Sequence, residues 1–245
     1  MSAWKTLVSV ATYNERENIE PLVAAIRESV SDLHVLVIDD GSPDGTGEWC
    51  QQFEEEHPWF HYIQRGSKQG LGTATICGMQ FAIDQGYDLW IGMDADFSHP
   101  PTRLPAMIES IGEFSSPVAD VVIGSRYCPG GGVSGWPWTR RIMSRCVNIY
   151  ARLLMGLSPK DCSGAFRCCR IALLEEFDFS AIQSTGYSFF EEFLWHLKRL
   201  GARVVEIPII FVDREFGQSK LNRKEAFHSL WVMFKLGIRN WLRLG

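Results

Sequence analysis

The chain has 245 residues, of which 46% are hydrophobic, and a formal net charge of −5 at pH 7. This length suits one large α/β domain or two small ones, and the apolar fraction is sufficient for a sizeable core. The net acidity gives no reason to expect nucleic acid as a partner, although nine basic residues stand against four acidic ones from Arg199 onward. The composition therefore indicates a globular protein in which basic residues outnumber acidic ones near the C-terminus.

The cysteines and the lengths of the apolar runs indicate the cellular compartment in which the protein is expected. The seven cysteines are an odd number, include the adjacent Cys168 and Cys169, and form no C-x-x-C motif. This pattern is untypical of a disulfide framework or a zinc site and favours a reducing cytosol. No apolar run approaches the ~18 residues that cross a bilayer, and residues 1–17 contain no hydrophobic stretch long enough for a signal peptide. Any membrane contact is expected to be peripheral.

Short apolar strands alternate with amphipathic helical segments along the first half of the chain. The predicted order is strand 6–11, helix 18–30, strand 34–38, helix 45–56, strand 60–64, helix 71–85, strand 88–93, helix 101–113 and strand 119–124. Strands that read as continuous apolar runs between helices predict an α/β fold with a mostly parallel sheet and helices on both faces.

The second half is less regular. The Gly-rich stretch 128–138 is predicted to be a mobile loop inside one domain. Helices are predicted over 139–156 and 186–201, followed by a strand over 202–211.

Polar clusters follow three of the predicted strands, at the points where the strands end. They are TYNERE after the first strand, DDGSPDGT after the second and DADFSHPP after the fourth. Ligands of open α/β sheets bind beyond the carboxyl ends of the strands. We therefore expect the three clusters to lie along one edge of the sheet.

Asp94 and Asp96 stand one residue apart at the end of the fourth strand. Side chains at i and i+2 of an extended segment point to the same side, so the two carboxylates can converge on one point. Two carboxylates that close need a cation between them, or one must take up a proton. For an isolated pair, a solvated loop in which Asp94 caps the next helix would be the better explanation.

Two turn-rich segments also have a structural explanation. In DDGSPDGT, Asp44 can cap a helix, while Asp39 can accept hydrogen bonds from a base or a ribose. RGSKQGLG, residues 65–72, lacks the residue order of a P-loop, so its glycines are expected to allow close packing of a helix on the sheet.

The motifs taken together resemble the family 2 glycosyltransferases of the GT-A fold, and within them the polyprenol-phosphate mannose synthases. The motifs are TYNE, DDGSPDGT, MDADFSHPP, GSRY, DCSGAFR and REFGQSK, and they span about Val8 to Leu221. Such an ordered series is far more specific than any single motif. Two departures are Ala11, where the family usually has proline, and DCSGAFR in place of the usual D-x-T-S-G-F-R.

The resemblance implies a Rossmann-like catalytic domain over residues 1–222 and a C-terminal amphipathic helix over 223–245. Its nucleotide pocket would be lined by residues that follow the first two strands: Ala11, Tyr13, Glu15, Ile38, Asp39 and Asp40. Asp94 and Asp96 would hold Mg²⁺ or Mn²⁺ against the donor diphosphate, with Ser98 standing where some relatives carry a glutamine ligand. Such a cation stabilises the charge that builds up on a leaving nucleoside diphosphate.

The acceptor implied by the resemblance is a polyprenyl monophosphate. Its phosphate is already an oxyanion at neutral pH, so a general base is not required to activate it. It needs a binding site formed by basic side chains. Residues matching the family's phosphate-binding positions are Arg126, Arg140, Ser144, Arg214 and Lys220, and Glu192 matches an acid that orients a cation or acts as a base. The residues assigned to catalysis are Asp94, Asp96, Arg126 and Arg214. Arg141, Arg145 and Arg152 fit surface ion pairs and lipid headgroup contact equally well.

Three functions remain open. The first is transfer of mannose from GDP-mannose to a dolichyl or undecaprenyl phosphate, with inversion at the sugar carbon, on the cytoplasmic face of a membrane. The second uses a UDP-sugar, with glucose passed to polyprenyl phosphate or to another acceptor. The third is a nucleotide-binding module without turnover, which the intact D-A-D motif disfavours.

The C-terminal segment 226–245 has the composition of an interfacial helix. Lys235, Arg239 and Arg243 recur every fourth residue and form one basic stripe. Aromatic and apolar residues stand beside it: Phe227, Trp231, Phe234, Ile238 and Trp241. Such a helix can bind a membrane surface, or its apolar side can pack on the protein's own core or on a second subunit.

Overall fold

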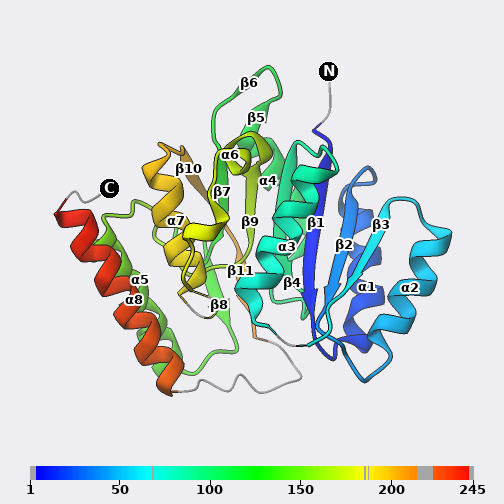
Figure 1. Ribbon diagram of the computed structural model, residues 1–245, viewed down its shortest axis with the longest axis horizontal. Helices are drawn as coiled ribbons and strands as arrows, with labels where there is room; N and C mark the ends of the chain where they lie inside the picture. Colours follow the sequence, from blue (N-terminus) through cyan, green and yellow to red (C-terminus); the bar gives the residue numbers. More distant parts are fainter. Residues whose placement is uncertain (1–3, 68, 185, 187, 214–222, 243–245) are drawn as a thin grey trace.

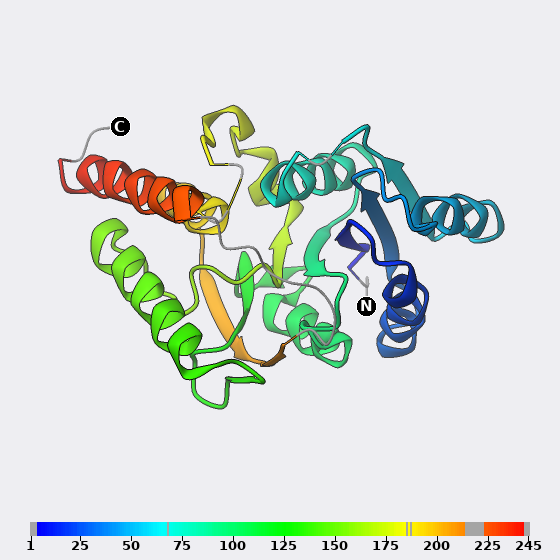
Figure 2. The same cartoon turned by 90° about the horizontal axis from the view of Figure 1, so that it is seen from below.

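The structure is a computed structural model that describes residues 4–67, 69–184, 186, 188–213 and 223–242, with the backbone alone for 223–228. Figure 1 shows one central sheet with helices packed around it. Figure 2, the view from below, shows helices on both sides of that sheet. The predicted α/β class is therefore confirmed.

The central sheet has seven strands in the order β10-β7-β9-β4-β1-β2-β3. In chain order they are β1 (Thr6–Thr12), β2 (His34–Asp39), β3 (Phe60–Gln64), β4 (Leu89–Asp94), β7 (Val121–Ser125), β9 (Arg167–Arg170) and β10 (Val204–Pro208). Strands β3, β2, β1 and β4 pair in parallel, as do β7 and β10, whereas β9 runs antiparallel to both β4 and β7. The sheet is thus mostly parallel, as predicted, with one reversed strand in its middle.

Strand β9 has no signal in the sequence pattern. Its residues RCCR begin and end with arginine, so the segment lacks the apolar run that indicates a buried strand. Cys168 and Cys169 are nevertheless fully buried and belong to hydrophobic clusters on opposite faces of the sheet. Pairing with β4 and β7 therefore decides the conformation of this segment. All seven cysteines of the chain are free thiols.

Helices cover both faces of the sheet, and each face has its own core. One face carries α1 (Arg16–Ser29), α2 (Thr46–Glu56), the 3₁₀ helix η1 (Pro101–Arg103) and α4 (Leu104–Ile111). The other carries α3 (Leu71–Asp84), α5 (Trp138–Met155), α6 (Ile171–Glu175), the 3₁₀ helix η2 (Phe179–Ala181), α7 (Phe189–Arg199) and α8 (Arg223–Trp241). Because successive strand side chains point to opposite faces, Leu7 and Val8 lie in different cores.

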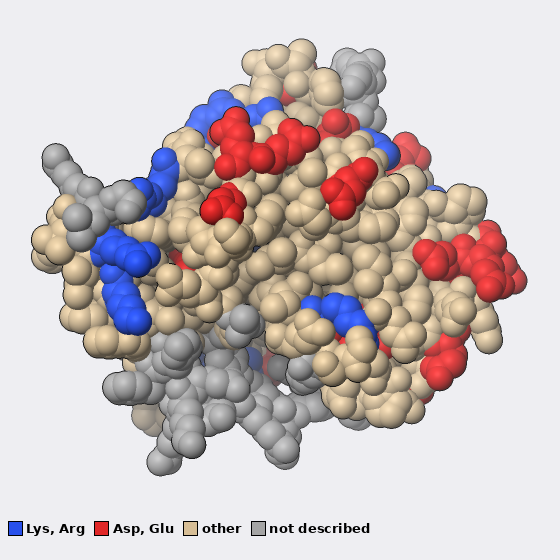
Figure 3. Space-filling view, viewed as in Figure 1, with Lys and Arg blue, Asp and Glu red and all other residues tan. Residues whose placement is uncertain are grey.

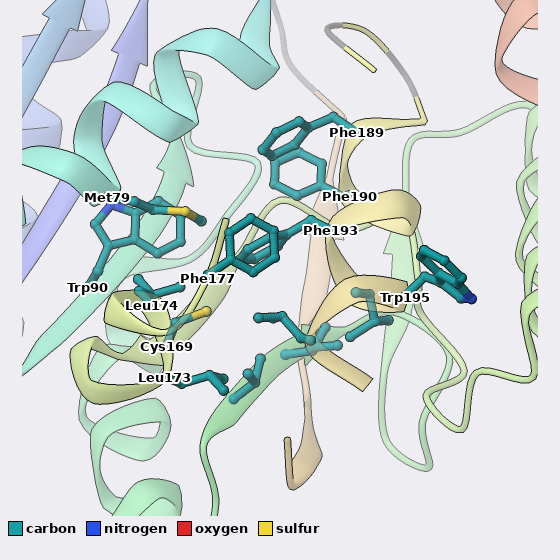
Figure 4. Close-up of a cluster of buried hydrophobic side chains, with 14 of the residues drawn as sticks. Met79, Trp90, Cys169, Leu173, Leu174, Phe177, Phe189, Phe190, Phe193 and Trp195 are labelled. Carbon is teal, nitrogen blue, oxygen red and sulfur yellow. The ribbon is translucent and has the colours of Figure 1, made fainter. Parts of the chain in front are cut away.

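The core on the α7 face is rich in aromatic side chains. Figure 4 shows Phe189, Phe193 and Trp195 of α7 in the same buried cluster as Trp90 of β4 and Met79 of α3. Truncating one such phenylalanine to alanine costs about 3–5 kcal/mol in a well-packed core. This packing fixes α7 against the central strands, whose ends carry the candidate site.

Two short strand pairs lie outside the central sheet. They are the antiparallel pair β5 (Gly112–Glu113) and β6 (Ser116–Pro117), and the parallel pair β8 (Gly132–Ser134) and β11 (Ile210–Val212). Strand β8 lies in the stretch 128–138 that is predicted to be a mobile loop, and its pairing ties that stretch to the chain after β10. The predicted strand 202–211 is correspondingly two strands, with Pro208, which has no backbone N–H, at the end of the first.

The C-terminal helix α8 packs against α5 and α7, and Figures 1 and 2 show α5 and α8 side by side at one end of the molecule. Val232, Met233 and Leu236 of α8 join the core, while Trp231 and Phe234 are exposed. The apolar residues of this helix are therefore divided between the protein's own core and its surface. Among the described residues, no helix is both long and apolar enough to cross a membrane.

Candidate active site

The carboxyl ends of β1, β2 and β4 form one edge of the sheet, at the bottom of Figure 1. Ala11 pairs with Ile38 of β2 on one side and with Asp94 of β4 on the other. Thr12 pairs with Asp39. The three polar clusters therefore share one edge, as predicted, and this is the edge at which α/β sheets bind ligands.

Asp39, a predicted nucleotide-binding residue, is completely buried. Its carboxylate accepts hydrogen bonds from the Thr12 hydroxyl at 3.0 Å, from the amides of Gly41 and Ser42 at 3.0 and 2.8 Å, and from the Ser42 hydroxyl. A carboxylate has about four lone-pair sites, so these bonds occupy it. Asp39 thus holds the shape of the loop beside the predicted base pocket.

Asp40 is paired with Arg65, the first residue of the RGSKQGLG segment, to which the sequence analysis assigned no site role. Nε of Arg65 donates to the Asp40 carboxylate at 2.6 Å, and Nη1 donates to the Thr73 hydroxyl at 2.7 Å. These bonds join the end of β2 to the first turn of α3 and span the RGSKQGLG loop. The pair therefore braces one wall of the predicted nucleotide pocket.

The other predicted nucleotide residues differ in their exposure. Tyr13 is 41% exposed on the edge of the sheet, whereas Ile38 is buried. Glu15 accepts a hydrogen bond from Asn18 at 2.7 Å. Asn14 and Phe97 are the non-glycine residues with positive φ among the described residues, at 61° and 59°. Both stand in loops of this edge, and such strained backbone clusters at functional sites.

The predicted metal ligands Asp94, Asp96 and Ser98 lie at the end of β4 and in the turn after it. The Ser98 amide donates to Asp96 Oδ1 at 3.1 Å, which orients that carboxylate. The Ser98 hydroxyl is buried and has no hydrogen-bond partner among the described residues. Two carboxylates and an orphaned hydroxyl oxygen are hard donors of the kind that Mg²⁺ and Mn²⁺ prefer, so the residues fit the implied ion.

His99 is a site residue that the sequence reasoning did not single out, although it stands in the DADFSHPP motif. Its Nδ1 accepts a hydrogen bond from the Asp94 amide at 3.0 Å, and its ring stacks on Phe166. Burial lowers the pKa of His99, against the opposing effect of the Asp94 and Asp96 carboxylates. Because Nδ1 acts as an acceptor, its 3.9 Å approach to the Asp94 carboxylate is a neutral contact. His99 therefore positions the backbone of Asp94.

Arg126 follows β7, which points the same way as β4 because both are antiparallel to β9. Its Nε and Nη2 donate to the buried carboxylate of Asp161 at 2.7 and 2.6 Å, and Nη2 also donates to Ser163 at 2.8 Å. Burial would raise the pKa of Asp161, but the Arg126 guanidinium outweighs it and the pKa is lowered. The DCSGAFR loop therefore supplies the partner that orients Arg126.

Helix α5 is joined to this loop by a buried amide. Asn148 accepts hydrogen bonds from the amides of Cys162 and Ser163 at 2.6 and 3.3 Å. It donates to the Ser144 carbonyl at 2.8 Å and to the Ser163 hydroxyl at 3.1 Å. The Ser144 hydroxyl in turn accepts from Tyr127 at 2.7 Å. Ser144 is thus near the Arg126 loop, as its predicted role requires.

The predicted site acid Glu192 lies in the first turn of α7. It is buried, and its carboxylate accepts hydrogen bonds from the amides of Gln183 and Ser184 at 3.0 and 2.8 Å. It therefore anchors the loop that precedes α7. Burial raises the pKa of the neighbouring Glu191 to about 7, and the charges of Arg167 and Arg126 oppose that shift.

The remaining predicted phosphate ligands are Arg140, Arg214 and Lys220. Arg140 donates to Asp213 at 2.8 Å and lies over the Trp136 ring, 4.1 Å from its centroid. Arg214 and Lys220 lie outside the described residues. The structure thus brings Arg126, Ser144 and Arg140 to the α5 side of the candidate site.

Comparison with known sequences agrees with this geometry. Residues 7–178 match the profile of "Glycosyl transferase family 2". The chain belongs to this family. Family 2 enzymes are glycosyltransferases. In this member the predicted metal-binding and nucleotide-binding positions at the ends of β1, β2 and β4 share one edge of the sheet.

Curated relatives of this glycosyltransferase are similar over most of their length. It is 39% identical over 239 residues to a polyprenol monophosphomannose synthase of Mycolicibacterium smegmatis, covering 97% of this chain and 89% of the relative. It is 40% identical over 218 residues to an undecaprenyl-phosphate mannosyltransferase of Micrococcus luteus, covering 89% and 88%. A dolichol-phosphate mannosyltransferase of Pyrococcus furiosus is 35% identical, with 95% of this chain and 63% of the relative covered.

Solved structures show the same GT-A fold at low identity. A mannosyltransferase of Pyrobaculum calidifontis in complex with GDP-Man and Mn²⁺ superposes with a TM-score of 0.60 at 16% identity, covering 100% of this chain and 66% of the other. The glucosyl-3-phosphoglycerate synthase of Mycobacterium tuberculosis in complex with UDP gives a TM-score of 0.64 at 16% identity, with 95% and 80% covered. At such identities the likeness establishes the fold alone.

Proposed function

We propose that this protein transfers mannose from GDP-mannose to a dolichyl or undecaprenyl monophosphate, with inversion at the sugar carbon. The observation that carries the proposal is 39% identity, over 97% of the chain, to an enzyme named polyprenol monophosphomannose synthase. The geometry supports the proposal, because Asp94 and Arg126 follow strands that point to the same edge of the sheet. The carboxylates there suit a metal-bound diphosphate, and the arginine suits a phosphate.

Asp94, Asp96 and Ser98 hold Mg²⁺ or Mn²⁺ in this proposal. When bound, the ion offsets the negative charge that develops on the departing nucleoside diphosphate. The amide of Ser98 orients Asp96, and His99 fixes the backbone at Asp94. Tyr13 and Glu15, with Ala11, Ile38, Asp39 and Asp40, form the nucleotide pocket on the neighbouring strand ends.

Arg126 is assigned to a substrate phosphate. Asp161 holds two of its nitrogens, and Nη1 bonds to none of the described residues, so one donor edge remains for an anion. Such a preorganised cation stabilises phosphate charge without reorganisation at the moment of reaction. The acceptor phosphate is itself the nucleophile. Arg140, Ser144, Arg214 and Lys220 complete the phosphate-binding set, and Glu192 fixes the loop beside it.

A membrane-facing surface accounts for access to a lipid acceptor. We define the α5–α8 surface by the exposed apolar side chains of these two helices and of the residue after α8, which are Trp138, Ile142, Met143, Ile149, Leu153, Leu230, Trp231, Phe234, Ile238, Trp241 and Leu242. Figure 3 shows basic side chains over α8 at the same end of the molecule. Apolar and aromatic side chains beside basic ones suit the interface of an anionic membrane.

The α5–α8 surface also supports a proposal about where the protein works in the cell. We propose that residues 1–222 form the catalytic domain and that 223–245 help to hold it on the cytoplasmic face of the membrane. In this proposal the contact is peripheral and is made through the α5–α8 surface.

Radiolabelled sugar transfer tests the proposed activity. The protein is incubated with GDP-mannose or UDP-glucose and a short polyprenyl phosphate, with Mn²⁺ or with EDTA. We expect lipid-linked product from GDP-mannose with Mn²⁺, and little with EDTA. Product from UDP-glucose alone would replace this proposal with the UDP-sugar alternative, and GDP binding in a thermal shift assay without any product would indicate a module without turnover.

A further inference from the structure

His34, His61 and Tyr87 form a cluster at the opposite end of the sheet from the candidate active site. His34 is the first residue of β2, His61 is the second of β3, and Tyr87 precedes β4. Leu36 pairs with His61, so His34, two residues before Leu36, points to the same face of the sheet as His61. The cluster therefore joins the amino ends of two paired strands to the segment that leads from α3 into β4.

The three side chains bring three donor atoms together. The Tyr87 hydroxyl oxygen lies 2.9 Å from Nδ1 of His34 and 3.0 Å from Nε2 of His61, and the two nitrogens are 3.4 Å apart. The centroids of the two imidazole rings are 5.6 Å apart, so nitrogens only 3.4 Å apart lie on the facing sides of the rings. Tyr87 is 5% exposed.

The 3.4 Å separation of the two nitrogens is close to that of metal ligands, whereas the two oxygen-to-nitrogen separations are hydrogen-bond distances and would lengthen by a few tenths of an ångström around an ion. A tetrahedral Zn²⁺ with bonds of about 2.0–2.1 Å holds its ligand atoms about 3.3 Å apart. Imidazole nitrogens suit borderline transition metals, whereas Mg²⁺ and Mn²⁺ favour oxygen ligands. Burial lowers the pKa of both His34 and His61, which favours the neutral rings that bind metals, and it raises the pKa of Tyr87 to about 12, which favours the protonated phenol.

The surrounding charges are mixed. Lys5, whose Nζ lies 4.3 Å from the centroid of the Tyr87 ring, and Arg27 oppose a cation, while Glu54 near His61 favours one. A cation that is attracted by charge alone is therefore not expected to bind here. An ion that forms strong coordinate bonds to imidazole nitrogens is expected to bind.

We propose that His34, His61 and Tyr87 form a second metal site, selective for a borderline divalent ion such as Zn²⁺, which fastens β2 and β3 to the entry of β4. The ion takes the place of the hydrogen bonds among the three atoms. A proton on His61 Nε2 moves to Nδ1, and the phenol oxygen binds either with its proton or after releasing it to solvent. The site is independent of the proposed glycosyl transfer.

Zinc titration of the chelator-stripped, untagged protein tests the site. Affinity is measured at pH 7.5 by competition with a chromophoric chelator, and geometry by the visible spectrum of the Co²⁺ form. We expect one equivalent of Zn²⁺ to bind, a Co²⁺ spectrum typical of a four-coordinate site, and no competition from excess Mg²⁺. His34→Gln and His61→Gln should each weaken binding at least about tenfold.

Two control variants separate this site from the others. Asp96→Asn removes a carboxylate of the candidate active site, and His57→Gln removes a nearby histidine outside the cluster, so both should bind Zn²⁺ like the wild type. Tyr87→Phe keeps the ring, and should fold and yet bind more weakly, which covers the case in which a histidine variant does not fold. Absence of binding by the wild type, unchanged binding by Tyr87→Phe and both histidine variants, or loss of binding in Asp96→Asn would each overturn the proposal.

Discussion

The guanidinium of Arg126 is held by the buried carboxylate of Asp161, with Nε and Nη2 at 2.7 and 2.6 Å from its two oxygens. A third bond runs from the Arg126 amide to the same carboxylate at 2.9 Å. One residue of the GSRY motif is thereby fixed by one residue of the DCSGAFR motif, in both position and orientation. Removing one partner of such a buried pair leaves an uncompensated charge.

The first prediction concerns this pair. Asp161→Asn keeps the shape of the side chain but removes the charge that compensates Arg126, so we expect a loss of about 3 kcal/mol in the free energy of unfolding. For a chain of this size that corresponds to a fall of roughly 6–12 °C in Tm. Asp213→Asn is the matched control, because the Arg140–Asp213 pair is partly exposed and should be worth less than about 1 kcal/mol. Equal losses in the two variants would show that the Arg126 pair is no more than a surface ion pair.

The second prediction concerns the proposed metal ligands. Asp96→Asn should lower mannosyl transfer about a thousandfold, since the change removes metal-binding charge worth several kcal/mol in the transition state. Tm without metal should stay close to that of the wild type, because the amide retains the shape. Stabilisation by Mn²⁺ together with GDP should be lost. Most of the activity surviving under saturating substrates would remove Asp96 from the metal site.

The third prediction compares three arginines. Arg126→Ala and Arg214→Ala should lower turnover by orders of magnitude, because each removes a cation assigned to a substrate phosphate. Arg145→Ala should do much less, since this residue is assigned to the helix surface. Turnover is measured at saturating donor and acceptor, and circular dichroism checks that Arg126→Ala folds. Comparable losses in all three would mean that a different face of α5 meets the substrate.

The fourth prediction uses the Asp120 carboxylate, which accepts hydrogen bonds from Arg203 and Arg170. The Arg203 hydrogen bonds are the main cause that holds the pKa of Asp120 well below its ordinary value, against the effect of burial. The unfolded chain binds a proton at this group at a higher pH than the folded one, so its contribution is present above about pH 4 and declines as the pH falls further. Asp120→Asn should cost about 1–2 kcal/mol at pH 7 by urea unfolding, and the difference from the wild type should narrow below pH 4. A difference that does not change with pH would show that the charge of Asp120 is unimportant.

The fifth prediction concerns the α5–α8 surface. Trp138 and Trp241 are 72% and 73% exposed, so replacing both with serine should leave the fold intact and reduce flotation with anionic liposomes. Transfer to a short, water-dispersed polyprenyl phosphate should change little, while transfer to a long acceptor in vesicles should fall. Deleting 226–245 is a poorer test, because Val232, Met233 and Leu236 belong to the core and the truncated chain is expected to be destabilised. Unchanged flotation of the double variant would contradict membrane docking by this surface.

The local sequence pattern was sufficient to predict several strands of this protein and the position of two site residues. The runs that form β1, β2 and β4 are continuous and apolar, so their conformation follows from the residues themselves. Asp39 and Asp94 stand directly at the ends of these strands, and parallel pairing brings them to one edge. The sequence pattern also identified the aromatic and apolar residues of α8. It did not decide which of them pack into the core and which are exposed.

Tertiary structure alone decided the rest, because the deciding contacts join segments far apart in the chain. Strand β9 forms because β4 and β7 pair with its two edges. The residues RCCR have no alternating or continuous apolar pattern that would predict a strand. Asp161 lies 35 residues from Arg126 in the chain, and nothing in the DCSGAFR motif indicates that pairing. Likewise, the sequence does not indicate that Glu192 accepts hydrogen bonds from the amides of Gln183 and Ser184. A sequence shows which groups can form hydrogen bonds. The partner of a buried charge depends on the tertiary structure, because burial excludes water and leaves only the neighbouring protein groups as partners.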